Sequence, residues 1–156
     1  MDIVDNSNSP FAIDNLEKDP GFLMLQVSRL WAETHDRKLK KHFGLSDMQY
    51  AVLASIYWFV LHDRQVTQTT LARHTKIDPM TISQMFKVLE KKGYIHRTIH
   101  VTDIRAKTVH LTQQGLELMR QTVPVINDVD AKFFQILGKD LPRFNKYMVD
   151  LLKSND

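Results

Sequence analysis

The spacing of apolar and polar residues divides the chain into helical stretches and one pair of strands. Up to residue 92, most apolar side chains recur every three or four positions, the spacing of helices that bury one face. From Tyr94 to Ile99 and from Lys107 to Leu111 the period changes, and the side chains alternate as in half-buried strands. The helical period returns after residue 112. The pattern predicts a mainly α fold with a single two-stranded hairpin.

N-cap residues mark the expected helix starts. Five apolar segments follow such a residue: Asp19, Ser46, Thr67, Asp78 and Thr112. Gln49 completes a capping box with Ser46, whereas Thr70 stands where a Glu would make the Thr67 start stronger. The expected helix ends are Gly44, Gly93 and Gly138. The helix of residues 46–61 is apolar on most sides, so we expect it to be the central buried element.

The long helix after Thr112 carries a heptad-like seam. Its positions are spaced alternately by three and four residues: Leu116, Met119, Val123, Ile126, Asp130, Phe133 and Leu137. Asp130 is the one polar interruption, and Pro124 can bend the helix. Such a seam indicates packing against a second chain, but it could equally pack inside one chain.

The composition is that of a folded protein that is neither secreted nor embedded in a membrane. The 156 residues suffice for one domain with a buried core. Residues 1–15 lack the features of a signal peptide and are expected to form a loose arm. The longest apolar run, residues 50–61, is too short to span a bilayer. The absence of cysteine excludes disulfides and thiol chemistry and fits a cytoplasmic protein.

Positive charge is concentrated in the middle of the chain. Residues 64–107 carry nine Lys or Arg and three acidic residues, a formal charge of +6 within a chain whose net charge is +3. The remaining residues therefore sum to −3. Such a block can be an ordinary solvated face, but a basic centre between acidic flanks favours a polyanionic partner.

The middle of the chain has the order of a helix-turn-helix unit followed by a hairpin. The second helix of such a unit can lie in the DNA major groove, where Gln84 could bond a base edge and Lys87 could neutralise a phosphate. The alternative is an ordinary amphipathic helix with a solvated polar face. The residues of the two helices expected to contact DNA are Thr67, Gln68, Thr69, Pro79, Met80, Thr81, Ser83, Gln84, Lys87 and Lys91.

From about residue 20 to its end, the chain resembles the MarR family (multiple antibiotic resistance regulators) of winged helix-turn-helix proteins. The segments that carry the resemblance are LSDMQYAVLASI, VTQTTLARHTKIDPMTISQMFKVLEKKGYIHR and DIRAKTVHLTQQG. The resemblance implies a homodimeric transcriptional regulator, expected to be a ligand-responsive repressor, that binds a palindromic operator in double-stranded DNA. Residues 16–44 and 113–156 would form the dimerisation helices, and residues 45–112 the winged helix-turn-helix region with its two-stranded wing.

The most specific part of the resemblance lies in the wing. Asp103 and Arg105 precede Lys107, and all three are expected to lie at the DNA. In the family the wing arginine enters the minor groove and the nearby aspartate orients it. A narrow minor groove attracts an inserted arginine, and a carboxylate can hold the guanidinium in place. The alternative is an exposed ion pair of little energetic value. His100-Val101 replaces the Asp-Pro pair common in the family.

Other site chemistry is sparse in the sequence. Many members of the family bind small aromatic or anionic effectors, and the side chains expected to line such a cleft are Trp31, His35, Met48 and Trp58. These residues could equally belong to the core. Although His35, His42 and His62 could meet in the fold, we expect no metal and no cofactor.

Two other classes of function compete with DNA binding. The sequence contains no nucleophile elbow, phosphate loop or dinucleotide fingerprint, so we expect no enzyme. The main alternative is a winged-helix module that binds a protein and has lost DNA recognition. Arg105 and the basic middle of the chain argue against that alternative.

Overall fold

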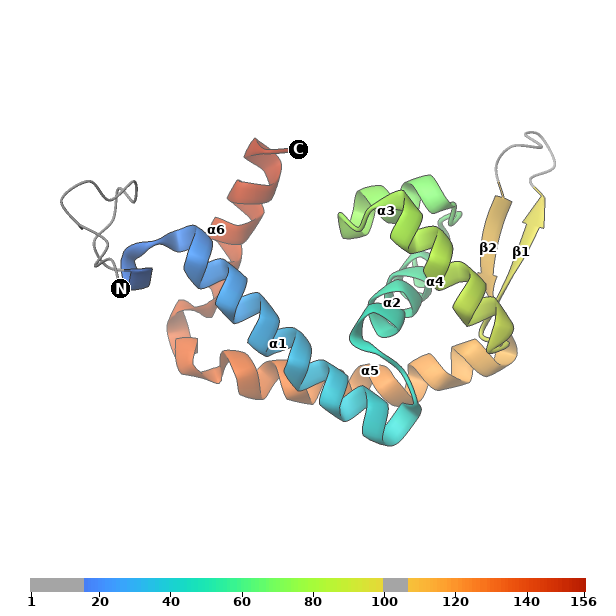
Figure 1. Ribbon diagram of the computed structural model, residues 1–156, viewed down its shortest axis with the longest axis horizontal. Coiled ribbons are helices and arrows are strands. Elements are labelled where there is room, and N and C mark those ends of the chain that lie inside the picture. The colour runs from blue at the N-terminus through green and yellow to red at the C-terminus, as the bar shows by residue number, and fades with distance from the viewer. Residues whose placement is uncertain (1–15, 100–106) are drawn as a thin grey trace, which may run out of the picture.

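The computed structural model describes residues 16–99 and 107–156 (Figure 1). The predicted arm, residues 1–15, and the wing residues Asp103 and Arg105 lie outside the described residues. The main elements are α1 (Pro20–Phe43), α2 (Asp47–Leu61), α3 (Gln68–Thr75), α4 (Pro79–Lys91), β1 (Ile95–Ile99), β2 (Lys107–Leu111), α5 (Gln113–Phe134) and α6 (Leu141–Ser154). Short 3-10 helices at Leu16–Lys18 and Gln135–Asp140 complete the described part.

The helices begin where the capping residues predict. Asp19, Ser46, Thr67, Asp78 and Thr112 each accept a hydrogen bond from a backbone N–H in the first turn of the helix that follows. At α3 the cap is reciprocal, because the Thr67 N–H donates to Oγ1 of Thr70 at 2.9 Å and the Thr70 N–H donates back to Oγ1 of Thr67 at 3.1 Å. The start that the sequence made weakest is therefore a complete capping box.

The hydrophobic core is built around α2, as expected. The α2 residues Val52, Leu53 and Ile56 have no exposed surface. Around them pack side chains of α3, α4 and α5 that are at most 1% exposed: Leu71, Ile82, Phe86, Leu89, Met119 and Ile126. The α2, α3 and α4 helices and the two strands thus form one lobe, called here the winged lobe (residues 47–99 and 107–111), which packs on α5.

The hairpin is joined to the helices by hydrogen bonds. The strands pair antiparallel with Ile95 opposite Leu111 and Arg97 opposite Val109. The Val109 N–H donates to the carbonyl of Val66 at 2.8 Å, just before α3 begins. An isolated two-stranded hairpin is only marginally stable in water, so this third segment anchors the wing to the helix-turn-helix unit.

The expected strand at Tyr94 begins one residue later, because Tyr94 belongs to a corner. Its carbonyl accepts a hydrogen bond from the Thr112 N–H at 3.0 Å, while the Thr112 hydroxyl donates to the carbonyl of Gly93 at 2.6 Å. Helix α5 therefore starts in contact with the beginning of the hairpin. Gly115 is needed there, since a Cβ on it would lie 2.0 Å from the Tyr94 carbonyl oxygen.

The heptad-like seam of α5 packs largely inside its own chain. Met119 and Ile126 belong to the core, and Asp130 bonds to side chains of α1. The seam therefore does not provide the independent support for a dimer that the sequence pattern indicated. The helix itself ends at Phe134, and the 3-10 segment Gln135–Asp140 replaces the predicted last turn before Gly138.

Two helical faces carry exposed apolar side chains. In Figure 1, α6 stands apart from the winged lobe, and the first half of α1 lies on the same side of the molecule as α6. The exposed apolar residues on these two segments are Leu23, Met24, Leu25, Val27, Leu30, Tyr147, Met148, Val149, Leu151 and Leu152. We call them the terminal apolar faces. None of the described helices has the length and apolar character needed to cross a membrane.

Candidate nucleic-acid interface

The outward side of α4 presents long polar side chains to solvent. Gln84, Lys87 and Lys91 are exposed, and Met80 is 72% exposed near the start of the helix. Among the described residues, no ion pair joins Lys87 or Lys91 to a carboxylate. The opposite side of α4 buries Ile82, Phe86 and Leu89. This burial fixes the orientation of the helix and keeps the polar side chains outward.

The N-terminus of α4 is occupied by its own cap. Thr81 donates its hydroxyl to Oδ2 of Asp78 at 2.5 Å, and its backbone N–H donates to Oδ1 at 2.9 Å. These hydrogen bonds hold the pKa of Asp78 below its usual value, and the bond from the Thr81 hydroxyl has the larger effect. The Thr81 hydroxyl therefore stabilises the helix start, and it can face DNA only as an acceptor.

Two of the expected DNA contacts on α3 also hold the unit together. Thr67 is the reciprocal cap described above, and the Gln68 amide donates to the carbonyl of Pro79 at 2.8 Å. The Gln68 bond ties the start of α3 to the start of α4. Thr69, the second residue of α3, is exposed. The structure thus brings the predicted residues of α3 and α4 to one region, but it gives Thr67, Gln68 and Thr81 structural roles there.

The wing is held against α4 by an ion pair that the sequence analysis did not identify. The Arg97 Nε of β1 lies 3.2 and 3.1 Å from the two carboxylate oxygens of Glu90 on α4. The Arg97 guanidinium lowers the pKa of Glu90, chiefly by hydrogen bonding. These residues are seven positions apart across a helix end, so no regular spacing marks the pair. Lys107 lies exposed at the start of β2.

A second tie fixes the far end of α4. The Lys92 ammonium donates to the carbonyl of Gly44 at 2.8 Å and to Oε1 of Gln49 at 3.1 Å. The basic residues between positions 64 and 107 therefore have two different roles. Arg97 and Lys92 stabilise the lobe, whereas Lys87, Lys91 and Lys107 remain available on its surface.

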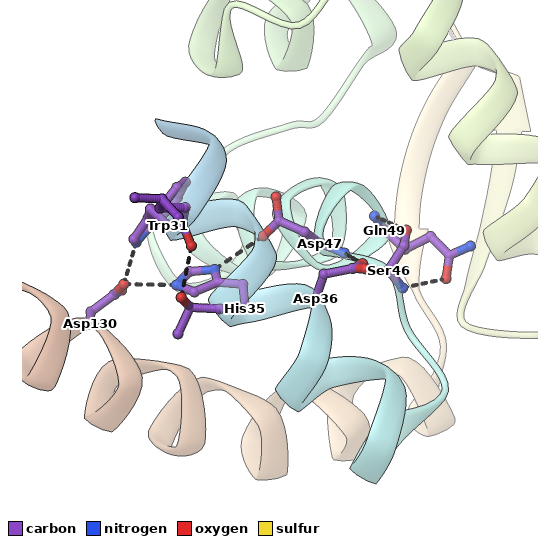
Figure 2. Close-up of polar contacts among 9 residues, drawn as sticks. Trp31, His35, Asp36, Ser46, Asp47, Gln49 and Asp130 are labelled. Atoms are coloured by element: carbon purple, nitrogen blue, oxygen red, sulfur yellow. Dashed lines mark hydrogen bonds and ion pairs between the residues drawn. The ribbon is translucent and has the colours of Figure 1, made fainter. Parts of the chain in front are cut away.

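Two of the expected effector residues lie in a buried joint between α1, α2 and α5 (Figure 2). His35 of α1 is 2% exposed, with Nδ1 at 3.1 Å from Oδ1 of Asp47 on α2 and Nε2 at 2.8 Å from Oδ1 of Asp130 on α5. The Trp31 indole N–H donates to the same Asp130 oxygen at 2.7 Å. Trp31 and His35 are thus brought together, but their polar atoms already have partners.

The other two expected effector residues do not share one place. Met48 follows Asp47 at the start of α2 and is partly exposed. Trp58 lies eleven residues after Asp47, about 16 Å further along the helix at 1.5 Å per residue. There its ring stacks on His62 and His74, with centroids 4.1 and 5.0 Å apart. The structure therefore does not support one effector cleft lined by all four residues.

A separate cleft lies between the second half of α1 and α5. Its volume is about 510 Å³. The lining residues are Thr34, Arg37, Lys38, Lys41, His42, Asp128, Val129, Lys132 and Phe133. We call it the α1/α5 cleft. Lys132 pairs with Asp128 at 2.6 Å, but no ion pair joins Arg37, Lys38 or Lys41 to a described carboxylate.

The described residues contain no group of three or more side chains able to hold a metal ion. His35 contacts two carboxylates and an indole, while His62 accompanies Trp58 at the other end of α2.

Comparisons with known proteins agree with this architecture. The family model described as an ArnR1-like winged-helix domain matches residues 38–130. An uncharacterised HTH-type transcriptional regulator of Bacillus subtilis, YdcH, is 32% identical over 134 residues, which are 86% of this chain and 90% of the relative.

Solved structures have the same fold. The S. aureus MepR–DNA complex superposes with a TM-score of 0.76 at 21% identity, covering 88% of this chain and 98% of MepR. Sco3205, a MarR family transcriptional regulator from Streptomyces coelicolor solved in complex with DNA, also superposes with a TM-score of 0.76. Its identity is 22%, and the match covers 90% of this chain and 92% of Sco3205.

Proposed function

Because the chain belongs to the ArnR1-like winged-helix domain family and has the fold of MarR family regulators, we propose that it regulates transcription by binding a palindromic operator as a homodimer. Helix α4 reads the major groove, and the wing contacts the adjacent minor groove. The expected mode is repression relieved by a small effector. The prediction that the chain is not an enzyme is confirmed, because the family and the relatives are transcription regulators.

The outward side of α4 is the observation that carries this proposal. A helix with a buried apolar side presents Gln84 for a base edge and Lys87 and Lys91 for phosphates, without a competing carboxylate among the described residues. The caps and the Gln68–Pro79 bond fix this helix on the lobe. Such a fixed, basic and polar side suits the major groove.

The experiment that tests this function is selection of binding sites from a random pool of DNA duplexes. We expect one enriched motif with two inverted half-sites whose centres lie about one helical turn, roughly 34–36 Å, apart. The double variant Gln84→Ala and Lys87→Ala serves as the matched control and should enrich the same motif less strongly. The proposal is wrong if the full chain enriches no sequence at low salt.

The alternative of a protein-binding module is separated by the same experiment. A winged helix that has lost DNA recognition would enrich no motif, and its weak DNA binding would not depend on the duplex sequence. The free basic side chains on α4 favour DNA over this alternative.

A homodimer is supported by the terminal apolar faces rather than by the α5 seam. Leu30 is 58% exposed, and Leu151 and Leu152 are 52% and 55% exposed. Exposed apolar side chains gathered on a helix are typical of an interaction surface in a folded protein. A second copy of the chain would bury it on both partners.

The α1/α5 cleft is a better candidate for the effector site than the buried joint. Its volume lies in the range of sites for small molecules, and it combines the basic residues Arg37 and Lys41 with the apolar residues Val129 and Phe133. This lining fits a small organic anion with an aromatic or aliphatic body. His35, in contrast, is buried and already bonded on both ring nitrogens.

Thermal shifts with a panel of aromatic carboxylates, zinc and peroxide test the effector. We expect stabilisation by a carboxylate that is lost in Arg37→Gln and kept in Arg29→Gln, which changes an exposed arginine of α1 outside the cleft. Stabilisation by zinc alone, abolished by changing His35 or His42, would show that the histidines and not the cleft hold the ligand.

A further inference from the structure

His35 lies where α1 and α5 meet the winged lobe. It belongs to α1 and contacts the first residue of α2 through Nδ1 and Asp130, near the C-terminal end of α5, through Nε2 (Figure 2). The joint is reinforced by the carboxylate of Asp36, whose Oδ1 accepts the backbone N–H of Asp47 at 3.0 Å. A change in this cluster therefore acts on three helices at once.

The two contacts of His35 require a proton on each ring nitrogen. An ionised carboxylate can only accept hydrogen bonds, and a neutral imidazole has only one N–H. With Asp47 on one side and Asp130 on the other, only the imidazolium can donate in both directions. Deprotonation would leave one ring lone pair facing a carboxylate oxygen at close range.

The energetic balance favours the charged form. Burial by itself would lower the pKa of His35, but the hydrogen bonds to Asp47 and Asp130 and their negative charges outweigh it and raise the pKa above 6.5. The contribution of the imidazolium to stability is therefore complete below pH 6.5 and is lost as the pH rises through the raised pKa.

No other described group facing His35 is expected to change its charge in the same window. From α2, Tyr50 meets the imidazole edge to face at 6.2 Å, and burial followed by the charges of Asp130 and Asp47 raises the Tyr50 pKa to about 12. On α1, the Lys40 ammonium holds the pKa of Asp36 below its usual value, and Trp31 does not titrate. His35 is thus the group of the joint that is expected to lose its charge as the pH rises above 6.5.

We propose that His35 is a positioning residue: as an imidazolium it holds the winged lobe at a fixed angle to α1 and α5, and its deprotonation weakens operator binding. The inference rests on the proposed function, because two α4 helices must present themselves one DNA turn apart. A joint that is already rigid avoids the entropic cost of fixing that spacing upon binding. Loosening the joint restores that cost and lowers the affinity.

The test is the operator affinity of the full chain between pH 6 and 9 at constant ionic strength. For wild type we expect a loss of at least about threefold per pH unit through the titration, since each linked proton can change affinity by up to about tenfold per unit and a dimer carries two copies of His35. The operator affinity of His35→Gln should not change with pH and should equal the weak affinity of wild type at the alkaline end of the range. His62→Gln, which removes an exposed histidine of the winged lobe, should keep the wild-type profile.

The titration of the His35 ring in wild type, followed by NMR, keeps the test valid even if His35→Gln does not fold. Its midpoint should lie above 6.5 and coincide with the loss of affinity. A flat wild-type profile with specific binding intact, a wild-type slope in folded His35→Gln, or a midpoint below 6.5 would overturn the positioning role alone. Loss of specific binding at every pH would instead refute the proposed function, and with it this inference.

Discussion

Gln84 presents its carboxamide to solvent from the middle of α4, on the side opposite the buried side chains of Ile82 and Phe86. A carboxamide in this position can donate and accept toward one adenine. We predict that Gln84→Ala relaxes base preference at one position of each half-site, at a cost of roughly 1–3 kcal/mol there. Competition binding with operators mutated one base pair at a time measures this effect.

Lys87 offers a point charge instead, so its removal should act on all sequences alike. Lys87→Ala is expected to weaken binding uniformly and to reduce the salt slope by about 0.9 for each phosphate that the side chain no longer neutralises. Affinities measured over a series of salt concentrations give the slope. If neither Lys87→Ala nor Gln84→Ala alters affinity or motif, α4 does not read the operator.

The wing predictions concern residues outside the described part of the chain. Arg105→Ala should reduce DNA affinity strongly, most of all for operators with A·T-rich flanks, where the minor groove is narrow. Asp103→Ala should reduce it less, because this change removes only the orienting carboxylate and also removes a negative charge near the phosphates. Melting temperatures should stay close to wild type, since an exposed pair adds at most about 1 kcal/mol. Unchanged binding by Arg105→Ala would defeat the role assigned to the wing.

A side chain that the sequence pattern predicts to be functional can instead hold the fold together. Only the three-dimensional contacts distinguish a functional from a structural role. Thr81 lies in α4 and Gln68 beside it, and both are polar, yet Thr81 bonds to the cap residue of α4 and Gln68 bonds to Pro79. His35 was expected at an effector cleft, but its partners Asp47 and Asp130 are 12 and 95 residues away in the chain. No local pattern could have identified that cluster.

At the scale of elements, local signals predicted the helix starts because caps are made by residues two or three positions apart. The Ser46–Gln49 box and the Asp78 cap are present as expected. The partner of the α5 seam could not be predicted in this way, since spacing shows that a face is apolar but not what covers it. Here the face turns to the chain's own α2, where Met119 and Ile126 join the core.

The start of α5 should tolerate no added side-chain volume. Gly115→Ala places a Cβ 2.0 Å from the carbonyl oxygen of Tyr94, so the helix must move away from the hairpin. We predict a destabilisation of about 1–3 kcal/mol or more, as for overpacked cores. Gln113→Ala, two residues earlier and exposed, is the matched control. Denaturant unfolding of both variants measures the difference, and equal midpoints would contradict this close approach.

At the scale of the whole molecule, the distribution of apolar surface decides the state of assembly. The chain has a mass of 18.2 kDa. We predict that light scattering at micromolar concentration gives about twice that mass, because a second copy of the chain would bury the exposed side chains of the terminal apolar faces. Leu151→Glu together with Leu152→Glu should shift the protein toward monomers by placing charges in the interface.

Lys153→Glu changes a charged residue of the same helix and is the control for the leucine substitutions. It should leave the mass unchanged. A wild-type monomer at these concentrations would remove both the dimer and the argument for a palindromic operator.

The hydrogen bond from the Val109 N–H to the Val66 carbonyl has a consequence for exchange of backbone hydrogens with deuterated solvent. It joins the second strand of the wing to the segment that enters α3, and Val109 is only 2% exposed. This amide hydrogen can leave only when the wing separates from the helix-turn-helix unit, which also uncovers the core. Its protection should therefore approach that of global unfolding. The Asn155 amide at the end of α6 has only a long hydrogen bond, 3.4 Å to the Leu152 carbonyl, and should exchange within the dead time of the experiment. One series of spectra would therefore compare the winged lobe with the end of α6.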